Sequence, residues 1–280
     1  MAGCEDKRGS DPAPSSSVPT AAPIPISAGD PGASKDWTVR DIRGMAPEVT
    51  VRVHDPYEDK VLAFTAVPAV PVLDRILGDR WRTAGEVEFL CRDGYRASVP
   101  SSRFQKHQAF FALGRGGRHP FTLDKPVGGT PVTTDLRPLY LVWANLDDSV
   151  VRAEADFGWP YQIVGITAVD VSAKYDRIAP PEGAGAEAER GFVAFRRWCA
   201  RCHALDGVGG TVGPELNQPV SVTTYLRPEW LHRWIVDPLS VRRGTPMPGL
   251  PKDIPDRERT ARDIVAYLGA VAPAEDPTPK

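Results

Sequence analysis

Five consecutive residues carry the clearest chemistry in this sequence. They read Cys199-Ala200-Arg201-Cys202-His203, a C-x-x-C-H pattern. Two thiols three positions apart lie on one side of a helical turn, where they can add to the two vinyl groups on one edge of a porphyrin. The histidine then falls beneath the ring, where an imidazole nitrogen can bind the iron. The pattern predicts one covalent haem c held by Cys199 and Cys202, with His203 as an axial ligand.

Two other chemistries use a pair of cysteines at this spacing. A structural zinc site needs a second pair of ligands, and the sequence after His203 supplies none. A thioredoxin-like redox site needs a βαβ setting, whereas the residues around this pair predict helices. We therefore interpret the pair as a haem attachment site.

The second axial ligand can be argued from the methionines. The chain has three, Met1, Met45 and Met247, and only Met247 lies in the same segment as the cysteine pair. Prolines on both sides of Met247 predict a stiff loop, and a thioether ligand raises the potential of a His/Met haem. His232, in a helix predicted over 228–236, is the rival and is expected to face solvent. An iron with both axial positions filled suits electron transfer rather than substrate chemistry.

Other side chains near these ligands have two interpretations each. Trp230 and Trp234 are four residues apart on one helix face, so they either line the haem edge, with an indole N–H near a propionate, or pack in an ordinary core. Arg242 and Arg243 precede the Met247 loop. They either pair with a propionate, face an acidic partner, or form a solvated surface pair.

The segment 187–272 resembles a class I cytochrome c domain. Helices are predicted over 189–199, 228–236 and 256–270 from apolar spacing. The matching motifs are Gly191 and Phe195 before the first cysteine, Gly213-Pro214 after the histidine, Thr245-Pro246-Met247-Pro248, and Asp263–Leu268. The resemblance implies an all-α fold. It also implies that the Pro214 carbonyl accepts the second imidazole N–H of His203, and that Tyr267 is among the residues that contact the cofactor.

The segment 36–178 predicts a strand-rich domain of mixed order. Residues 50–54 and 86–89 alternate apolar and polar, and 139–143 and 161–166 are aromatic and β-branched runs. Short helices are expected over 70–77 and 103–113, the second capped by Ser101 or Ser102. The expected fold class is α+β, with a mixed, strand-rich N-terminal domain and an all-α C-terminal domain.

Residues 89–100, which contain the turn Asp93-Gly94-Tyr95, resemble part of the molybdopterin-binding domain of the sulfite oxidase family. His107–Ala112 is similar to the helix that follows there. That family's metal-binding cysteine precedes the turn in a C-x-x-N-like segment, whereas no cysteine lies between Cys4 and Cys91 in this chain.

This departure from the family pattern decides the expected role of the N-terminal domain. We do not expect a molybdopterin, and we interpret the domain as a cofactor-free relative that docks a redox partner, with Cys91 as a buried free thiol. The alternative is a molybdenum-dependent, sulfite-dehydrogenase-like oxidoreductase with Cys91 as thiolate and haem as its electron exit. A third possibility is an assembly or sensor lipoprotein in which the haem reports the redox state.

Three segments predict connections rather than folded domains. Residues 1–35 are rich in Pro and Ser and predict a flexible tether, 179–186 contains Pro180-Pro181 and predicts a linker, and 273–280 is a tail. Haem c attachment takes place outside the bacterial cytoplasmic membrane, as the cytochrome family implies. Ala2-Gly3-Cys4 resembles the end of a lipobox, so we expect a longer signal peptide and a lipid anchor at Cys4.

The overall composition narrows the function further. The 280 residues include 34 basic and 36 acidic side chains, a net charge of −2 that argues against nucleic acid as a partner. Histidines 54, 107 and 119 and the stretch 159–162 form no ligand pattern. The sequence thus predicts a lipid-anchored, periplasmic, mono-haem carrier that passes single electrons from a donor dehydrogenase to an acceptor cytochrome or oxidase.

Overall fold

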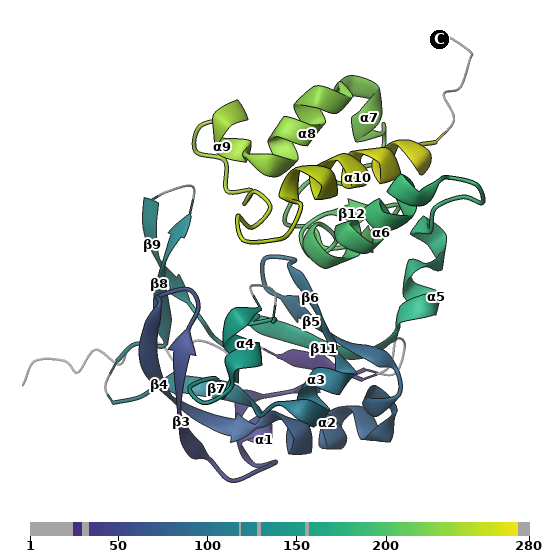
Figure 1. The fold of residues 1–280 in the computed structure, drawn as a ribbon. Helices are drawn as coiled ribbons and strands as arrows, with labels where there is room; N and C mark the ends of the chain where they lie inside the picture. The colour runs from purple at the N-terminus through teal and green to yellow at the C-terminus, as the bar shows by residue number, and fades with distance from the viewer. Residues whose placement is uncertain (1–24, 30–33, 118, 128–129, 155–156, 274–280) are drawn as a thin grey trace, which may run out of the picture.

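The chain forms a strand-rich N-terminal part and a helical C-terminal region, each with its own hydrophobic core (Figure 1). The computed structural model describes residues 25–29, 34–117, 119–127, 130–154 and 157–273. The first core runs from Ile26 to Ile166 and the second from Tyr175 to Leu268. The expectation of a mixed α+β chain with its helical part at the C-terminus is confirmed.

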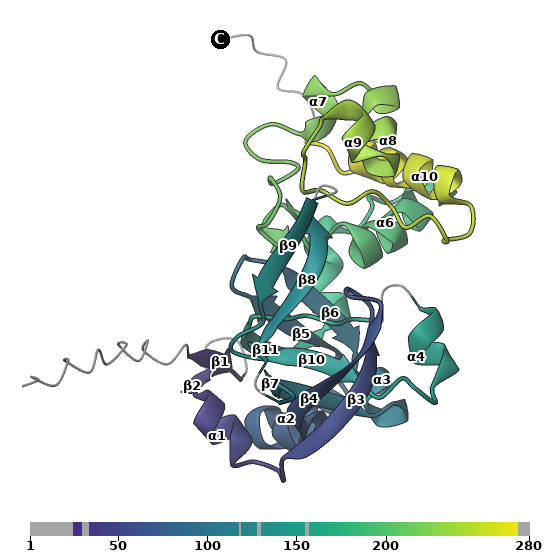
Figure 2. The same cartoon turned by 90° about the vertical axis from the view of Figure 1, so that its left-hand side faces the viewer.

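Two β-sheets build the N-terminal part. One has the order β2 (Lys35–Trp37), β1 (Ile26–Ala28), β11 (Ile163–Asp170), β5 (Gly85–Cys91), β6 (Arg96–Pro100). The other has the order β10 (Tyr140–Trp143), β7 (Ala109–Arg115), β4 (Lys60–Pro68), β3 (Val49–Asp55). A separate hairpin, β8 (Thr122–Val127) and β9 (Thr130–Asp135), projects toward the C-terminal region in Figure 2.

The core of the N-terminal part lies between the two sheets. Alternation along β3 buries Val51 and Val53 and leaves Arg52 exposed, because successive side chains point to opposite faces of a strand. Phe89 of β5 meets Phe111 of β7 with ring centroids 6.1 Å apart, so the two sheets share one apolar layer. The strands predicted over 50–54, 86–89 and 139–143 are confirmed.

In the residues described, five short helical segments complete the N-terminal part. They are α1 (Val39–Arg43), α2 (Ala69–Leu77), η1 (Gly78–Arg82), α3 (Ser101–Lys106) and α4 (Ser149–Ala153). The helix predicted over 103–113 is wrong beyond residue 106. Residues 109–115 form β7 instead, because this stretch is fixed by pairing with β4 and β10 on either side, which local helix propensity does not show.

The prediction of a tether over residues 1–35 is wrong for β1. Ile26 is fully buried, and Ser27 and Ala28 pair in parallel with Gly165 and Ile166 of β11. A single large apolar side chain among prolines and serines is enough to place this segment in the sheet, since β11 offers it a complete row of hydrogen-bonding groups. Cys4 lies outside the described residues.

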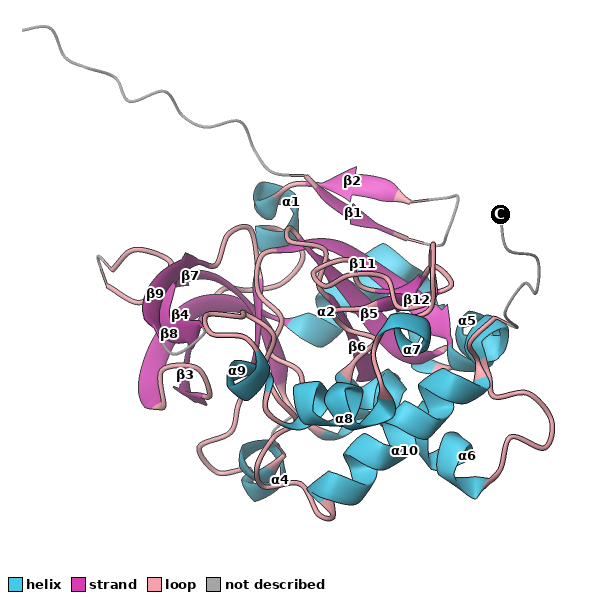
Figure 3. Cartoon of the chain, turned by 90° about the horizontal axis from the view of Figure 1, so that it is seen from above, coloured by secondary structure: helices cyan, strands magenta, loops and turns pink. Residues whose placement is uncertain are grey.

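The C-terminal region is a set of helices around two long ones (Figure 3). Its helices are α6 (Ala186–Trp198), α7 (Val222–Tyr225), α8 (Pro228–Val236), α9 (Pro238–Val241) and α10 (Arg257–Ala270), with a short ladder of β12 (Ala204–Leu205) and β13 (Val208–Gly209). The helices α5 (Val171–Tyr175) and η2 (Asp176–Ile178) lead into it from β11. Tyr175 and Ile178 pack in the second core, although they precede the predicted linker.

The crossing of α6 and α10 depends on one glycine. A Cβ on Gly191 would lie 1.8 Å from the carbonyl oxygen of Asp263, so no larger residue fits there. Beside it, Arg190 donates two hydrogen bonds to the Asp263 carboxylate, at 2.7 and 2.8 Å. Phe195 then packs against Tyr267, with ring centroids 5.3 Å apart. Close backbone contact, a bidentate ion pair and aromatic packing together fix the two helices.

None of the helices in the described part of the chain combines the length and the hydropathy that crossing a bilayer requires.

Candidate functional site

The C-x-x-C-H segment forms a tight turn at the end of α6. The Cys199 amide donates to the Phe195 carbonyl at 2.8 Å, and the His203 amide donates to the Cys199 carbonyl at 2.9 Å. This turn brings Cys199 and Cys202 to the same end of the helix, and both are half-buried free thiols. Burial raises the pKa of Cys199 to about 12 and that of Cys202 to about 11, so both thiols are protonated at neutral pH.

The imidazole of His203 is oriented by the loop that follows it. Its Nδ1 lies 2.8 Å from the Pro214 carbonyl oxygen, the contact that the cytochrome resemblance implies. A Cβ on Gly213 would come within 2.3 Å of the ring, so this position must be glycine for the loop to lie against the imidazole. With Nδ1 engaged by a carbonyl, Nε2 is the nitrogen left to bind a metal.

Met247 lies in a loop that is anchored to α8. The Trp234 indole N–H points at the Met247 sulfur at 3.1 Å, and the Met247 amide donates to the Thr245 hydroxyl at 3.3 Å. Beyond it, the Leu250 amide donates to the Ile235 carbonyl at 3.0 Å. The loop is therefore held on both sides of the thioether, as a ligand loop needs to be.

The remaining predicted residues have separate environments. Trp230 is 48 % exposed and stacks with the Arg233 guanidinium, so it does not share the environment of Trp234. Tyr267 is fully buried, and its hydroxyl donates to the Ile178 carbonyl at 2.6 Å. Arg242 and Arg243 are exposed. The prediction that His232 faces solvent is wrong: it is half-buried, with Nε2 3.2 Å from a Glu258 carboxylate oxygen, because α8 packs on the start of α10.

These residues fit a c-type haem by their chemistry. Two thiols lie at one helix end, an imidazole presents Nε2, and a thioether is fixed in a loop. The close approach of Gly213 to His203 leaves room on one side of the imidazole only for backbone. Such a donor set supplies the sulfur, nitrogen and thioether groups that this cofactor takes from a protein.

One feature of the site was missed from the sequence, namely the contact between the N-terminal part and the cysteine turn. The Arg96 amide donates to the Arg201 carbonyl at 2.8 Å, and the Thr211 amide donates to the Gly94 carbonyl at 3.0 Å. The Arg201 guanidinium also donates to the Tyr95 hydroxyl at 3.3 Å. The turn Asp93-Gly94-Tyr95 and the adjoining Arg96 are thus hydrogen-bonded to two segments of the cytochrome domain. One is Arg201, within the C-x-x-C-H pattern, and the other is Thr211, just before Gly213-Pro214.

The residue in this contact that the sequence could have pointed to is Gly94. Its φ of +89° lies in the region that favours glycine, and a Cβ there would lie 2.1 Å from the Thr211 hydroxyl oxygen. The glycine alone indicates a turn, but not what the turn touches. The partner lies more than a hundred residues away, so only the folded chain reveals it.

Cys91 is a buried free thiol, as interpreted from the sequence. Cys91 is 3 % exposed. Burial, together with the negative charge of nearby Asp93, raises the pKa of its thiol far above the ordinary value. A protonated, buried thiol is a poor nucleophile. Within the residues that the structure describes, no three His, Cys, Asp or Glu side chains gather as a metal site would need.

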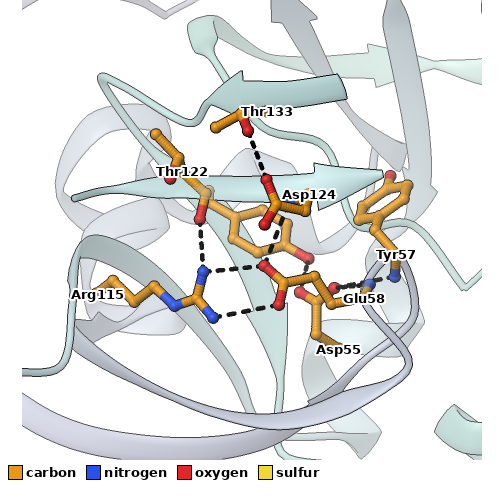
Figure 4. Close-up of polar contacts among 8 residues, drawn as sticks. Asp55, Tyr57, Glu58, Arg115, Thr122, Asp124 and Thr133 are labelled. Carbon is orange, nitrogen blue, oxygen red and sulfur yellow. Dashed lines mark hydrogen bonds and ion pairs between the residues drawn. The ribbon is translucent and has the colours of Figure 1, made fainter. Parts of the chain in front are cut away.

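The polar clusters of the N-terminal part connect its elements. Glu58 accepts two hydrogen bonds from Arg115, at 2.9 and 3.2 Å, and Arg115 also donates to the Thr122 carbonyl (Figure 4). His107 pairs with Asp148 at 2.5 Å, and His54 lies 3.4 Å from Asp59. These partners tie strands and turns together, and they leave the histidines as structural side chains.

Comparison with known proteins bears on the C-terminal region. Residues 186–268 match the family model described as cytochrome c oxidase, cbb3-type, subunit III, which is less than a third of the chain. A search of the curated proteins finds no match. The match and the helical architecture together define the C-terminal region as a c-type cytochrome domain. Such a domain implies haem c binding, electron transfer and redox partners.

Proposed function

We propose that this protein is a mono-haem c-type cytochrome that carries single electrons between redox partners. Cys199 and Cys202 attach the haem covalently, and His203 and Met247 are its axial ligands. The bound haem supplies a metal that changes oxidation state by one electron. The observation that carries the proposal is the oriented imidazole, with His203 Nδ1 on the Pro214 carbonyl at 2.8 Å at the end of a turn that holds two free thiols.

The residues of the chain would control the properties of that site. The Pro214 carbonyl fixes the tautomer and the plane of the His203 ring. The Trp234 N–H, 3.1 Å from the Met247 sulfur, restrains the thioether and withdraws electron density from it. With both His203 and Met247 holding the iron, no coordination position would remain for a substrate, which favours electron transfer.

The N-terminal part is proposed to be a cofactor-free relative of the sulfite oxidase-type domain that serves docking. Its contact with the C-x-x-C-H turn, through Gly94, Tyr95 and Arg96, supports a role next to the haem. The rival, a molybdenum enzyme with Cys91 as thiolate, is not favoured because no cysteine precedes the Asp93-Gly94-Tyr95 turn at the position of that family's metal ligand, and Cys91 itself is buried in the strand next to the turn. Elemental analysis separates the two, since one molybdenum per iron would require the enzyme.

The partners are proposed to be a donor dehydrogenase and an acceptor cytochrome or oxidase. Several large apolar side chains of the cytochrome segment are exposed, and they are candidates for contact with a partner. Among the residues described they are Val193 (62 %), Val212 (48 %), Val220 (51 %), Tyr225 (60 %), Trp230 (48 %) and Leu239 (45 %). The protein is proposed to act on the periplasmic side, held by a lipid on Cys4.

Absorption spectroscopy of the protein matured in a host that attaches haem c tests the proposal. We expect one covalently bound haem per chain, retained after denaturation, and a reduced form that does not bind carbon monoxide readily. A colourless protein would contradict the proposal. A haem that is lost on denaturation would contradict the attachment through Cys199 and Cys202, and rapid carbon monoxide binding would contradict the second ligand.

A further inference from the structure

The two sides of the proposed haem site differ in how another protein can reach them. On the cysteine side, the Arg96 amide donates to the Arg201 carbonyl at 2.8 Å, and the Thr211 amide donates to the Gly94 carbonyl at 3.0 Å. Gly210 lies so close to the same turn that a Cβ on it would be 3.0 Å from the Gly94 carbonyl oxygen. A partner that approaches the cysteine turn from this side therefore meets the chain's own N-terminal part.

The Met247 side of the site belongs to elements that face away from the N-terminal part. In Figures 1 and 2, α8 lies on the side of the C-terminal region that is turned away from β5 and β6. The Met247 sulfur is 3.1 Å from the Trp234 indole nitrogen of α8, and the Thr245 amide donates to the Arg242 carbonyl, just after α9, at 3.4 Å. The outer faces of α8 and α9 thus adjoin the loop that carries the second proposed ligand.

Exposed residues of α8, α9 and their flanks define a surface that combines arginine with large apolar side chains. Trp230 is 48 % exposed, and the Arg233 guanidinium lies over its ring, 5.5 Å from the centroid. Arg233 Nε also donates to the Ser240 hydroxyl at 3.2 Å, which joins α8 to α9. Next to Ser240, Leu239 is 45 % exposed. We call this the arginine–tryptophan surface, and its residues are Arg227, Trp230, Arg233, Leu239, Arg242 and Arg243.

The charge of this surface is opposite in sign to that of the whole chain. Residues 227–243 contain four arginines and two carboxylates, Glu229 and Asp237, whereas the chain as a whole has a net charge of −2. Arg227, Arg242 and Arg243 are exposed, and their side chains form no ion pair with the residues that the structure describes. Their guanidinium groups therefore remain available to carboxylates of another molecule.

We propose that the arginine–tryptophan surface docks an acidic redox protein, so that electrons pass on the Met247 side of the site. This inference rests on the proposed function. Arginine and tryptophan are the side chains that most often carry the binding energy of a protein interface. A positive surface on a chain of negative net charge also orients an acidic partner during encounter. Charge complementarity thus indicates the chemistry of the partner, and the covered cysteine turn indicates the face.

Fluorescence anisotropy of a fluorescein-labelled octaglutamate peptide, titrated with the full-length haem protein at low salt, tests the docking surface. The double variant Arg242→Gln with Arg243→Gln should weaken peptide binding about tenfold or more, since it removes two groups that form charged hydrogen bonds. Arg40→Gln with Arg52→Gln is the matched control, because it removes two exposed arginines of the N-terminal part, and it should bind as the wild type does. Equal losses in the two double variants, or no binding by the wild type, would overturn the proposal.

Stopped-flow oxidation of the reduced protein shows whether electrons leave at this surface. Each protein gives up one electron, either to ferricyanide, which is an anion, or to tris(phenanthroline)cobalt(III), which is a cation. In the wild type we expect the ferricyanide rate to fall as ionic strength rises. In Arg242→Gln with Arg243→Gln the ferricyanide rate at low ionic strength should fall about threefold or more, and the cobalt rate should rise. Unchanged rates with both oxidants would overturn electron transfer at this surface.

Two further measurements test the choice of occupant. Sedimentation of the protein alone detects a second copy, and flotation with phosphatidylglycerol vesicles detects an anionic membrane. A dimer, or vesicle binding, that is lost in Arg242→Gln with Arg243→Gln would overturn an acidic redox protein as the occupant.

The absorption spectrum, recorded first, separates this proposal from the proposed function. A protein without covalent haem would contradict the proposed function. A haem protein with the expected spectrum, whose peptide binding and oxidation rates do not change in Arg242→Gln with Arg243→Gln, would contradict the docking surface alone.

Discussion

The amide of Thr211 donates to the carbonyl of Gly94 at 3.0 Å, which joins the turn between β5 and β6 to the loop between the cysteine pair and Pro214. A side chain on Gly94 is disfavoured, because its Cβ would lie 2.1 Å from the Thr211 hydroxyl oxygen and Thr211 would have to shift. The same turn holds Arg201 through the Arg96 amide. The conformation of the haem-binding segment is thus set in part by a turn outside the cytochrome domain.

Replacing Gly94 should loosen this joint. Gly94→Ala adds the clash with Thr211 and strains a residue at φ +89°, so we expect a loss of about 1–3 kcal/mol in the free energy of unfolding. Urea unfolding followed by both haem absorbance and circular dichroism measures it. The double variant Gly94→Ala with Thr211→Ala removes the clashing hydroxyl and should recover part of the loss. No recovery would show that the strain lies in the turn alone.

Replacing Met247 tests the second axial ligand. Met247→Ala should leave a haem that binds carbon monoxide and should lower the reduction potential by about 0.1 V or more, since axial ligands shift haem potentials over about 0.8 V. Spectroelectrochemical titration measures the change. Met45→Ala is the matched control, because Met45 is half-buried in the N-terminal part. A Met247→Ala protein with an unchanged spectrum and potential would exclude the thioether as ligand.

Substitution of Gly213 should disturb the imidazole without removing it. In Gly213→Ala the new methyl would lie 2.3 Å from the His203 ring, so either the ring or the Pro214 loop must shift. We expect a changed haem absorption spectrum and a loss of about 1–3 kcal/mol in stability. Gly269→Ala is the control, since a Cβ at that position on α10 meets nothing within 4 Å. Identical spectra for both variants would contradict the packing of Gly213 on the ligand.

Glu88 should make stability depend on pH. Burial raises its pKa, but the charges of Lys174 and Arg96 outweigh this and hold the pKa below its ordinary value. A carboxylate whose pKa is lowered by folding stabilises the folded state fully at pH values above its pKa in the unfolded chain, about 4.3. This contribution is lost as the pH falls through the pKa of the carboxylate in the folded protein. Glu88→Gln should therefore cost about 3 kcal/mol near pH 7 and progressively less below about pH 4.

Chemical unfolding of both proteins between pH 3 and 7 checks this pH dependence. Glu48→Gln is the control, since Glu48 lies outside the two cores and is 38 % exposed in its pair with Arg43. A difference between the wild type and Glu88→Gln that stays constant across this range would show that the carboxylate acts by packing rather than by charge.

Local patterns explain which parts of the fold the sequence predicts. The helix at 228–236 begins with Pro228 at its first position and follows from that residue and its apolar spacing. The C-x-x-C-H turn, Gly213-Pro214 and the Met247 loop are also short motifs, whose geometry depends on neighbours in sequence. The predictions for residues 109–113 and for Ile26 are wrong because the structure of these residues depends on distant strands.

The joint between the two halves could not be predicted for the same reason. It consists mainly of backbone hydrogen bonds at Gly94, Arg96, Arg201 and Thr211, and backbone groups have no sequence signature. The ion pair of Arg196 and Glu86, 3.8 Å apart, likewise comes from α6 and β5, which the chain brings together only after about a hundred intervening residues. A single sequence shows the donors of the site but not the surface that supports them.

The position of β1 determines how a pull on the N-terminus would be carried through the molecule. β1 lies between β2 and β11, so tension applied before Ile26 acts along strands and is resisted by a row of hydrogen bonds in shear. The load enters the sheet at β11, the strand that leads through α5 and η2 into the C-terminal region. A molecule held by that end would therefore pass part of the pull on to the start of the helical region.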